Sequence, residues 1–353
     1  MASHLQAAEV KPVPVLTPII PLAPKRKRER VLEKIKKALA WLDADHNAEQ
    51  GLARREASIE RQRLAPSKKK TDIARLAPFA FLHLGCLAVF WVGVSPVAVG
   101  VALALYWARV FFVSAFFHRY FSHRTYSTNR FWQFIFALCC STTIQRGALW
   151  WAANHRHHHK YSDEPPDLHS PKQSGIWWAH LGWMTDEANM YTDYKLIPDL
   201  AKYPELVFLN RFDWLGGLFY GLALLGAGSL LHHFAPQLNT NGPQLLVWGL
   251  FVSTVVLFHG TCTINSLAHV FGSRRYETTD TSRNNFFLAL LTFGEGWHNN
   301  HHKYQGAVRQ GFYWWEIDIS FYILNAMSWL GIVYDLHPVP VQAYDVSNHR
   351  KQS

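Results

Sequence analysis

Histidine is concentrated in three short clusters, and imidazole is the side chain that most often binds metal ions in proteins. Long stretches of chain separate the clusters, which occupy residues 118–123, 155–159 and 298–302. A fourth fragment, residues 265–269, adds one histidine four positions after an asparagine. We interpret these pieces as one metal site that is divided along the sequence and assembled by folding.

Helical geometry gives the spacings a physical meaning, because positions i, i+3 and i+4 share one face of an α-helix. His155, His158 and His159 therefore point in one direction if their stretch is helical, and the last cluster repeats this pattern. His118 and His123 are five residues apart, which is about 140° on a regular α-helix. Either they flank one metal from a fraying helix end or they serve different ions.

The number of imidazoles exceeds what one ion needs. A structural zinc ion takes four ligands, so this supply favours two ions of borderline softness, such as iron. A purely structural role for the whole set is disfavoured, because buried imidazoles without a shared partner would leave polar atoms unsatisfied. The candidate ligands are His118, His123, His155, His158, His159, His269, His298, His301 and His302. Carboxylates near the clusters that could orient these rings are Asp163, Glu164, Asp167 and Glu295.

Four apolar stretches are predicted to span a membrane, at residues 79–94, 96–117, 214–231 and 244–264. The chain is 49% hydrophobic, with 15 Trp and 23 Phe, which is consistent with membrane insertion. The apolar stretch 131–144 is long enough only for a buried or interfacial helix. The aromatic stretch 311–330 is predicted to be an interfacial helix, since acidic residues near its start disfavour a fifth span.

The distribution of Lys and Arg orients these spans. The segments 25–75, 119–211 and 274–309 are rich in Lys and Arg, whereas the loops between the first two and last two spans have none. The positive-inside rule then places the basic segments, all histidine clusters and both termini in the cytosol. We therefore expect an all-α integral membrane protein, with four transmembrane helices in two hairpins and a cytosolic helical cap that carries a two-metal site.

Composition divides the chain into three segments. We expect a basic, partly disordered extension at residues 1–74 with a short amphipathic helix at about 31–42, a membrane domain at 75–335 and a polar tail at 336–353. The net charge of +10 suits attraction to anionic lipid headgroups. No nucleic-acid partner is expected, because the charge does not form a groove-reading helix or stripe.

A metal pair at the membrane surface, next to apolar hairpins, suits oxidative chemistry on a lipid chain. Two irons could take two electrons, activate dioxygen and remove hydrogen from an unactivated methylene. The protein would set the geometry of the metals, shape a dry cavity and hold the chain against them.

Over about residues 75–335 the sequence resembles the membrane fatty acyl desaturases of the Δ9 type. The resemblance is carried by HRYFSHRTYS, NHRHHHKYSDEPPDLHS, WWAHLGWM, NSLAHVFGSRRYET and GEGWHNNHHKYQGAVRQGFYWWEID. It implies that the nine candidate histidines ligate a di-iron centre and that Asn265 approaches one iron through water. It also implies insertion of a cis double bond into a saturated acyl chain, with O2 and two electrons consumed.

In this family a narrow tunnel bends the acyl chain at the carbons that are oxidised. Gln145, Trp151 and Thr261 match the places that hold the bend. Tyr106 and Val110 match the region of the tunnel's closed end, where a bulky side chain would limit chain length.

The resemblance leaves the acyl carrier open between acyl-lipid and acyl-CoA. Animal acyl-CoA desaturases have charged pairs where this chain has Ala153 and Asn154, and Glu187 and Ala188, so the pattern is closer to bacterial and plastid-type enzymes. Other cations that could replace those charges are Arg146, Arg156 and Lys172. Without a His-Pro-Gly-Gly haem motif, a separate electron donor is expected, either a ferredoxin or a cytochrome b5 type with its reductase. The expected location is a bacterial inner membrane.

Two other functions remain as alternatives. A histidine-box fatty acid hydroxylase or other oxygenase would use the same ligands, although Asn265 and the last histidine cluster favour desaturation. A non-enzymatic membrane metal-binding or transport protein would place polar ligands along a path through the spans. Here the clusters lie at one face and the spans carry few ionisable groups.

Overall fold

The computed structural model describes residues 42–64, 69, 71–345, 347 and 349. The chain divides into a first unit, Met1–Trp41, which lies outside the described residues, and a second unit, Leu42–Ser353. The amphipathic helix predicted at about 31–42 therefore falls almost entirely outside the described residues. Within the second unit, the described residues form helices and turns joined by isolated β-bridges.

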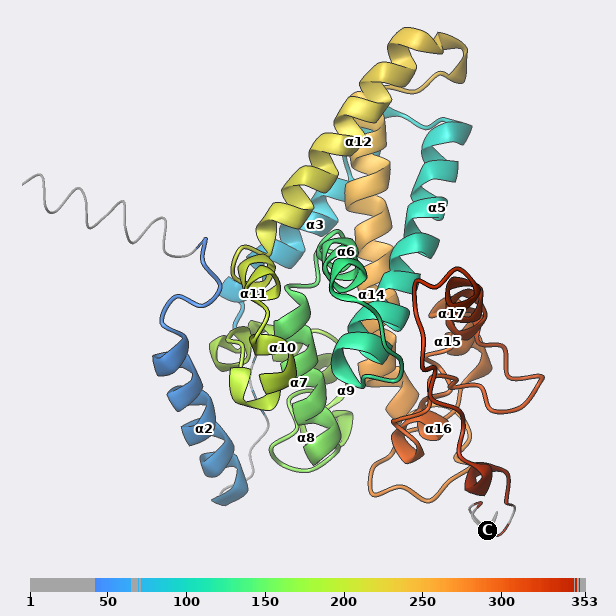
Figure 1. The fold of residues 1–353 in the computed structure, drawn as a ribbon. Coiled ribbons are helices and arrows are strands. Elements are labelled where there is room, and N and C mark those ends of the chain that lie inside the picture. The colour runs from blue at the N-terminus through green and yellow to red at the C-terminus, as the bar shows by residue number, and fades with distance from the viewer. Residues whose placement is uncertain (1–41, 65–68, 70, 346, 348, 350–353) are drawn as a thin grey trace, which may run out of the picture. The chain divides into compact units, whose positions relative to one another are not determined.

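Four helices in the described part are long and apolar enough to cross a membrane, and they are the four that the sequence predicts. They lie alongside one another in Figure 1 as the segments that contain α3, α5, α12 and α14. These spans are Ala74–Val92, Pro96–Ser122, Trp214–Phe234 and Gly242–His269. Their elements are η1 (Ala74–Leu76), α3 (Ala77–Cys86), α4 (Val89–Val92), α5 (Pro96–Phe111), η2 (Phe112–Ser122), α12 (Trp214–Phe234), α13 (Gly242–Leu246), η7 (Val247–Val252), α14 (Ser253–Ser266) and η8 (Leu267–His269).

Short loops join the spans into two hairpins, and polar side chains in these loops define where the helices begin. Ser95 caps α5, because its Oγ accepts a hydrogen bond from the N–H of Ala98 at 3.1 Å and Pro96 occupies the first helical position. Asn241 caps α13 in the same way, through the N–H of Gln244. Ser95 Oγ also donates to Gln244 Oε1 at 2.8 Å, so the first loop contacts the start of α13.

The remaining helices are short, and most belong to what we call the cap, residues 123–213 and 270–345. In Figure 1, α7, α8, α10 and α16 lie below the spans. The predicted helix at 131–144 is present as α6. The α-helices of the cap are α6 (Arg130–Ser141), α7 (Ala148–Tyr161), α8 (Pro171–Ser174), α9 (Ile176–His180), α10 (Pro198–Ala201), α11 (Pro204–Arg211), α15 (Phe286–Leu291), α16 (His298–Lys303) and α17 (Ile319–Trp329).

The interfacial helix predicted at 311–330 begins later than expected, because α17 starts at Ile319. The acidic residues before it are buried, with Glu316 1% and Asp318 0% exposed. Asp318 caps the helix by accepting a hydrogen bond from the N–H of Phe321 at 3.0 Å. The residues before α17 therefore fold around two buried carboxylates and do not continue the helix.

One helix of the predicted N-terminal extension, α2 (Ala48–Leu64), is ordered against the cap. Arg54 forms an ion pair with Glu187 at 3.3 Å. Gly51 lies so close to the ring of Tyr191 that a Cβ atom would meet it at 2.0 Å. This close approach indicates a packed contact between α2 and the cap.

Candidate metal centre and adjoining cavity

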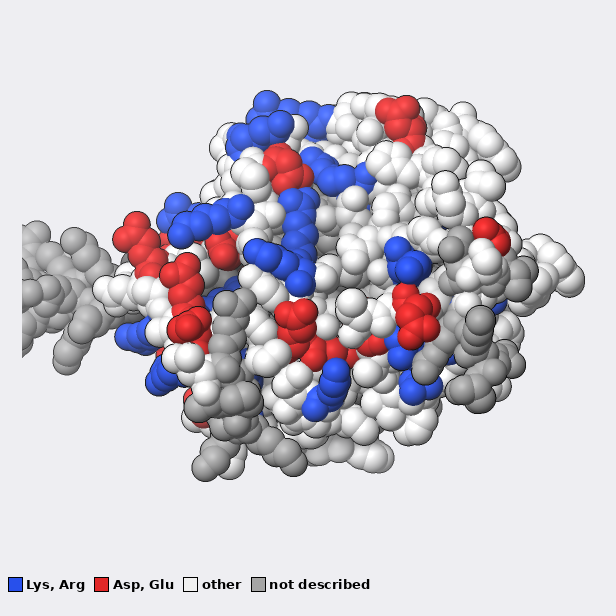
Figure 2. Space-filling view, turned by 90° about the horizontal axis from the view of Figure 1, so that it is seen from below, with Lys and Arg blue, Asp and Glu red and all other residues white. Residues whose placement is uncertain are grey.

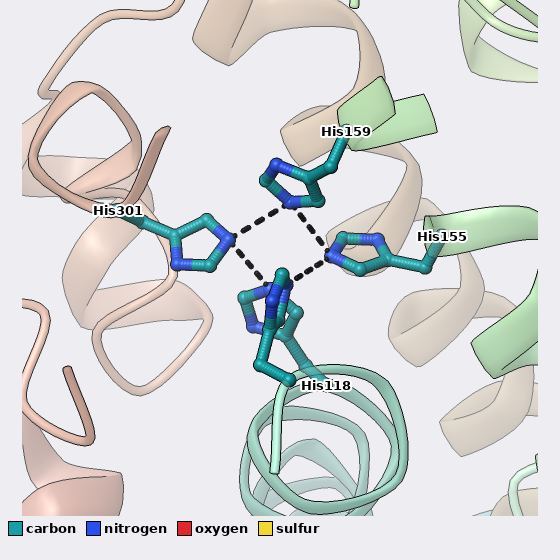
Figure 3. Close-up of side chains that lie close together, drawn as sticks. His118, His155, His159 and His301 are labelled. Atoms are coloured by element: carbon teal, nitrogen blue, oxygen red, sulfur yellow. Dashed lines mark hydrogen bonds between the residues drawn. The ribbon is translucent and has the colours of Figure 1, made fainter. Parts of the chain in front are cut away.

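Five candidate histidines bring their Nε2 atoms to a common point. The Nε2 atom of His301 lies 3.0 Å from those of His118 and His159. His155 Nε2 lies 3.0 Å from His159 Nε2 and 2.8 Å from His123 Nε2. Figure 3 shows four of these rings pointing toward one another. We call the five residues cluster A. A neutral imidazole has only one N–H and one lone pair, so a cation at the centre would satisfy nitrogens that cannot all satisfy one another.

A π-helical segment explains the five-residue spacing between His118 and His123. The segment η2 ends at Ser122, and the N–H of His123 donates to the carbonyl oxygen of His118 at 3.2 Å. Such i→i+5 hydrogen bonds define a π-helix, in which residues five apart lie nearly above one another. Both rings therefore reach cluster A, as the alternative with one shared metal requires.

The other four candidate histidines form a second group, which we call cluster B: His158, His269, His298 and His302. The Nε2 atoms of His298 and His269 are 3.1 Å apart. The rings of His302 and His159 have centroids 4.5 Å apart, so the two clusters adjoin. The predicted shared helix faces are present. On each face, however, the histidines belong to different clusters: in α7, for example, His155 and His159 are in cluster A and His158 is in cluster B.

Four of the histidines are oriented by buried carboxylates that contact their Nδ1 atoms. The carboxylate accepts a hydrogen bond from Nδ1–H. The Nε2 atom therefore carries the lone pair, which points into the cluster. The pairs are His118–Glu295, His158–Asp167 at 2.9 Å, His269–Asp163 at 3.3 Å and His302–Asp280 at 2.6 Å. Three of these carboxylates are among those predicted from the sequence. Asp280 was not predicted, and Glu164, which was, is exposed.

His302 carries the clearest sign that these residues fit a metal. Its Nδ1 atom is paired with Asp280, whereas its buried Nε2 atom has no hydrogen-bond partner among the described residues. Burial lowers the pKa of His302 to about 4, so the ring is neutral near pH 7 and its lone pair is available. A metal ion would satisfy this atom, and a donor set of imidazole nitrogens suits a borderline ion.

A buried ionic network fixes one of the orienting carboxylates. Arg119 is 1% exposed and contacts Glu295 at 3.2 Å and Asp318 at 2.9 Å. Glu295 also accepts a hydrogen bond from Ser114. Burial alone would raise the pKa of Glu295, but His118 and Arg119 hold it at about 2. The carboxylate is therefore ionised where it meets His118.

A cavity of about 440 Å³ adjoins cluster A. Its lining includes Phe79 and Leu82 from the first span, Phe258 from the fourth span, and His155 of cluster A. A smaller cavity of about 40 Å³ adjoins it and is lined by Val110 together with histidines of both clusters. The two cavities share four lining residues, which are Trp151, His155, Thr261 and Asn265.

Three predicted tunnel residues, Gln145, Trp151 and Thr261, line the larger cavity. Gln145 Nε2 donates to Thr261 Oγ1 at 3.0 Å, which joins the turn before α7 to the fourth span. We call this pair the clamp. Asn265 lines both cavities, beside the histidines that it was predicted to assist.

The two residues predicted for the closed end differ in their positions. Val110 lines the smaller cavity, next to the histidines. Tyr106 is 5% exposed but lines neither cavity. Its hydroxyl donates to the carbonyl oxygen of Leu291 at 2.9 Å, so it ties α5 to the end of α15.

Two arginines line the larger cavity, and both are paired with carboxylates. Arg75 pairs with Glu187 at 2.8 Å, and Arg146 pairs with Asp213 at 3.0 Å. Neither guanidinium is therefore a free positive charge for an anionic ligand.

The histidine clusters, the smaller cavity and three of the four spans fall within the residues that one family model matches. The family model described as fatty acid desaturase matches residues 93–327. The chain belongs to this family. The match begins in the loop after the first span, ends in α17 and contains all nine candidate histidines.

Characterised relatives of this desaturase cover most of its length. It is 36% identical over 257 residues to the sn-1 stearoyl-lipid 9-desaturase of Anabaena variabilis, which covers 72% of this chain and 89% of the relative. It is 33% identical over 271 residues to Delta-9 acyl-lipid desaturase 1 of Arabidopsis thaliana, with 76% and 84% covered. It is 34% identical over 277 residues to the Acyl-CoA C20 Delta5-desaturase of Anemone leveillei, with 75% and 82% covered. The predicted family, all-helical membrane fold and enzyme class are confirmed.

Proposed function

We propose that this desaturase introduces a cis double bond at the Δ9 position of a saturated acyl chain carried by a membrane lipid, at a centre of two iron ions. The observation that carries the proposal is a pair of adjoining cavities that together extend from the first span to histidines of both clusters. An acyl chain in this cavity would place a methylene beside the metal ligands. Relatives named as stearoyl-lipid and acyl-lipid 9-desaturases support the position of the bond.

Cluster A would hold one iron and cluster B the other, with Asn265 approaching one of them through water. The unpaired Nε2 atom of His302 and the converging Nε2 atoms of cluster A support this assignment. With O2 and two electrons, the iron pair supplies the oxidising power to remove two hydrogens from a saturated chain. The carboxylates on Nδ1 fix the direction of the imidazoles, so the protein sets the geometry of the ligands in advance.

The residues around the cavity would position the chain and exclude water. Gln145 and Thr261 join across the wall at the point where the two cavities meet, and the indole of Trp151 borders both. A chain passing this point would be bent between the clamp and the histidines. Val110 would limit how much of the chain extends beyond the bend.

The residues that line the larger cavity fit an acyl-lipid substrate better than an acyl-CoA substrate. The cavity lining includes Ala74 and Pro78, which are exposed residues at the start of the first span, so a lipid chain can enter from the side. The cations that could bind CoA phosphates are otherwise engaged or distant. Arg75 and Arg146 are paired, Arg156 pairs with Asp199 at 2.7 Å, and Lys172 is outside the lining.

Electrons would reach the centre from a separate protein on the other side of cluster A. A surface depression of about 450 Å³ is lined by His123 and His159, with Arg156 and Lys160 beside them. These histidines are not among those that line the acyl cavities. The exposed Lys160 suits an acidic redox protein of the ferredoxin or cytochrome b5 type, whereas Arg156 is paired with Asp199.

The charge distribution supports a cytosolic cap. Figure 2 shows Lys and Arg on the face of the second unit seen from below, on the side of the cap. The loops between spans one and two and between spans three and four carry none. By the positive-inside rule both termini would be cytosolic, in a bacterial inner membrane.

The test is expression in a host that lacks this activity, followed by mass spectrometry of fatty acids with derivatised double bonds. We expect a new cis bond at position 9 in lipid-bound chains, and none with His155→Ala or His302→Ala at equal amounts of membrane-inserted protein. After removal of metal, Fe²⁺ should restore activity and Zn²⁺ should not. Hydroxy acids would instead indicate an oxygenase, and metal uptake without any change in lipids would indicate a transporter.

A further inference from the structure

Arg109 is a buried arginine inside the second span, and none of the roles described above involves it. Only 1% of its surface is exposed. Among the described residues, no carboxylate appears in its hydrogen bonds or ion pairs. A charge buried in a membrane span is costly and is normally retained for a function. Its contacts therefore indicate what it holds in place.

Every N–H of the Arg109 guanidinium has an acceptor, and the acceptors come from several elements. The guanidinium also lies over the ring of Tyr220 in the third span, 4.8 Å from its centroid. The acceptors are Leu105 O at 3.3 Å, Thr142 O at 3.3 Å, Thr254 Oγ1 at 2.7 Å, Gly249 O at 3.3 Å and Ser253 Oγ at 2.7 Å. Because all of its N–H donors are engaged, the Arg109 side chain holds the surrounding segments together and is not free to bind a ligand.

Three of these acceptors, Thr142, Ser253 and Thr254, belong to the two segments that carry the clamp. Thr142 begins the turn that contains Gln145, between α6 and α7. Thr254 lies two helical turns before Thr261 in α14, on the same face, and it lines the larger cavity. Arg109 therefore joins the same two walls as the clamp, at a greater distance from the cap.

The turn that presents Gln145 needs such support. Ile144 has φ 58° and Arg146 has φ 68°, so the residues on both sides of Gln145 are in the left-handed region. This conformation is rare for residues other than glycine and is most unfavourable for a β-branched residue. Such a turn persists only where its surroundings hold it. Arg109 donates to the carbonyl oxygen of Thr142 at the start of this turn. The ion pair of Arg146 with Asp213 fixes the other end of the turn.

We propose that Arg109 is a positioning residue that fixes the clamp relative to the histidine clusters and thereby sets the position of the new double bond. The inference rests on the proposed function of Gln145 and Thr261 in bending the chain. Without the hydrogen bonds of Arg109, the turn that contains Gln145 and the helix α14 can shift relative to each other. The acyl chain then presents neighbouring methylenes to the centre, and products with the double bond at other positions form.

The test compares Arg109→Met with the unchanged protein in the same host, by locating double bonds in derivatised lipids. We expect minor positional isomers to rise about tenfold relative to the main product, the factor that corresponds to losing one hydrogen bond to a charged group. Arg109→Lys keeps the charge but cannot reach all the acceptors, so it should restore part of the selectivity. Tyr220→Phe is the matched control, because it removes a hydroxyl that also contacts Gly249 and leaves the guanidinium contacts intact.

A purely structural role would give less protein or less product at an unchanged position, and that result overturns the inference. If Arg109→Met fails to accumulate in membranes, Thr254→Val removes a single acceptor with little change in volume. It should shift the isomers in the same direction by a smaller factor, and an unchanged distribution would again refute the assignment. Failure of the proposed function is distinguishable, because the unchanged protein would then form no double bond at all.

Discussion

Asp280 shows how a single carboxylate prepares a histidine for a metal. It lies 2.6 Å from Nδ1 of His302 and also accepts hydrogen bonds from the N–H and the hydroxyl of Ser282. These contacts fix the carboxylate, and the carboxylate fixes the ring. The Nε2 atom then lies among the other ligand atoms of cluster B, with no hydrogen-bond partner in the part of the chain that the structure describes.

We expect Asp280→Asn to lower metal affinity by about 10-fold to 100-fold, because an orienting carboxylate makes the ring a stronger ligand. Metal content after dialysis against graded chelator concentrations measures the change. Glu277→Gln is the control, since Glu277 is an exposed carboxylate in the same segment. Equal metal retention by the Asp280→Asn variant and the control would contradict the role of Asp280.

Val110 is the better-placed residue for control of chain length. It lines the smaller cavity next to the histidines, whereas Tyr106 lies outside both linings. Val110→Phe should lower the use of longer saturated chains relative to shorter ones by about tenfold, because overpacking costs about 1–3 kcal/mol. Chain lengths of the products measure the shift. Leu103→Phe, at an exposed position of the same helix, should leave the profile unchanged.

Single side chains differ in how far the sequence predicts them. Six of the nine histidines, in the clusters 155–159 and 298–302, are predictable because their helical spacing repeats, and all nine meet in the two clusters. Asp280 has no such spacing, since it reaches His302 from a turn and only the fold brings the two together. The place of Tyr106 is also decided by packing, because helical position alone does not distinguish a cavity wall from a contact with the cap.

At the scale of elements, hydropathy predicts the four spans because each is apolar over a length that can cross a membrane. The π-helical segment η2 was not predictable from periodicity, which assumes a regular α-helix. The start of α17 was misplaced for a different reason. The residues before it are aromatic, but they form turns around the buried carboxylates of Glu316 and Asp318, which accept backbone hydrogen bonds.

Arg119 joins three of these elements, because it links η2 to Glu295 before α16 and to Asp318 at the start of α17. Arg119→Leu would leave two buried carboxylates without their partner. We expect a loss of about 3–5 kcal/mol in the free energy of unfolding, as for other broken buried ion pairs. Thermal unfolding in detergent measures it. Arg130→Leu breaks an exposed pair with Glu205 and should cause little change, and an equal loss in both variants would argue against the network.

At the scale of the whole molecule, the proposal requires the cap and the electron donor to be on the same side of the membrane. The cap carries the depression beside cluster A, and the basic segments that orient the spans belong to the cap or precede the first span. A cytosolic cap would therefore give the centre access to soluble reductants. The loop between the third and fourth spans would face the opposite compartment.

Labelling of introduced cysteines tests this orientation, because the native cysteines are buried or half-buried in apolar surroundings. Gln237 is exposed in the loop between the third and fourth spans, and Lys172 is exposed in the cap. In intact bacterial cells, a membrane-impermeant maleimide should label Gln237→Cys, whereas Lys172→Cys should react only after permeabilisation. The reverse pattern would put the cap outside the cytosol, where no soluble cytosolic donor reaches it, and the proposed route of electrons through the depression at His123 and His159 would then be wrong.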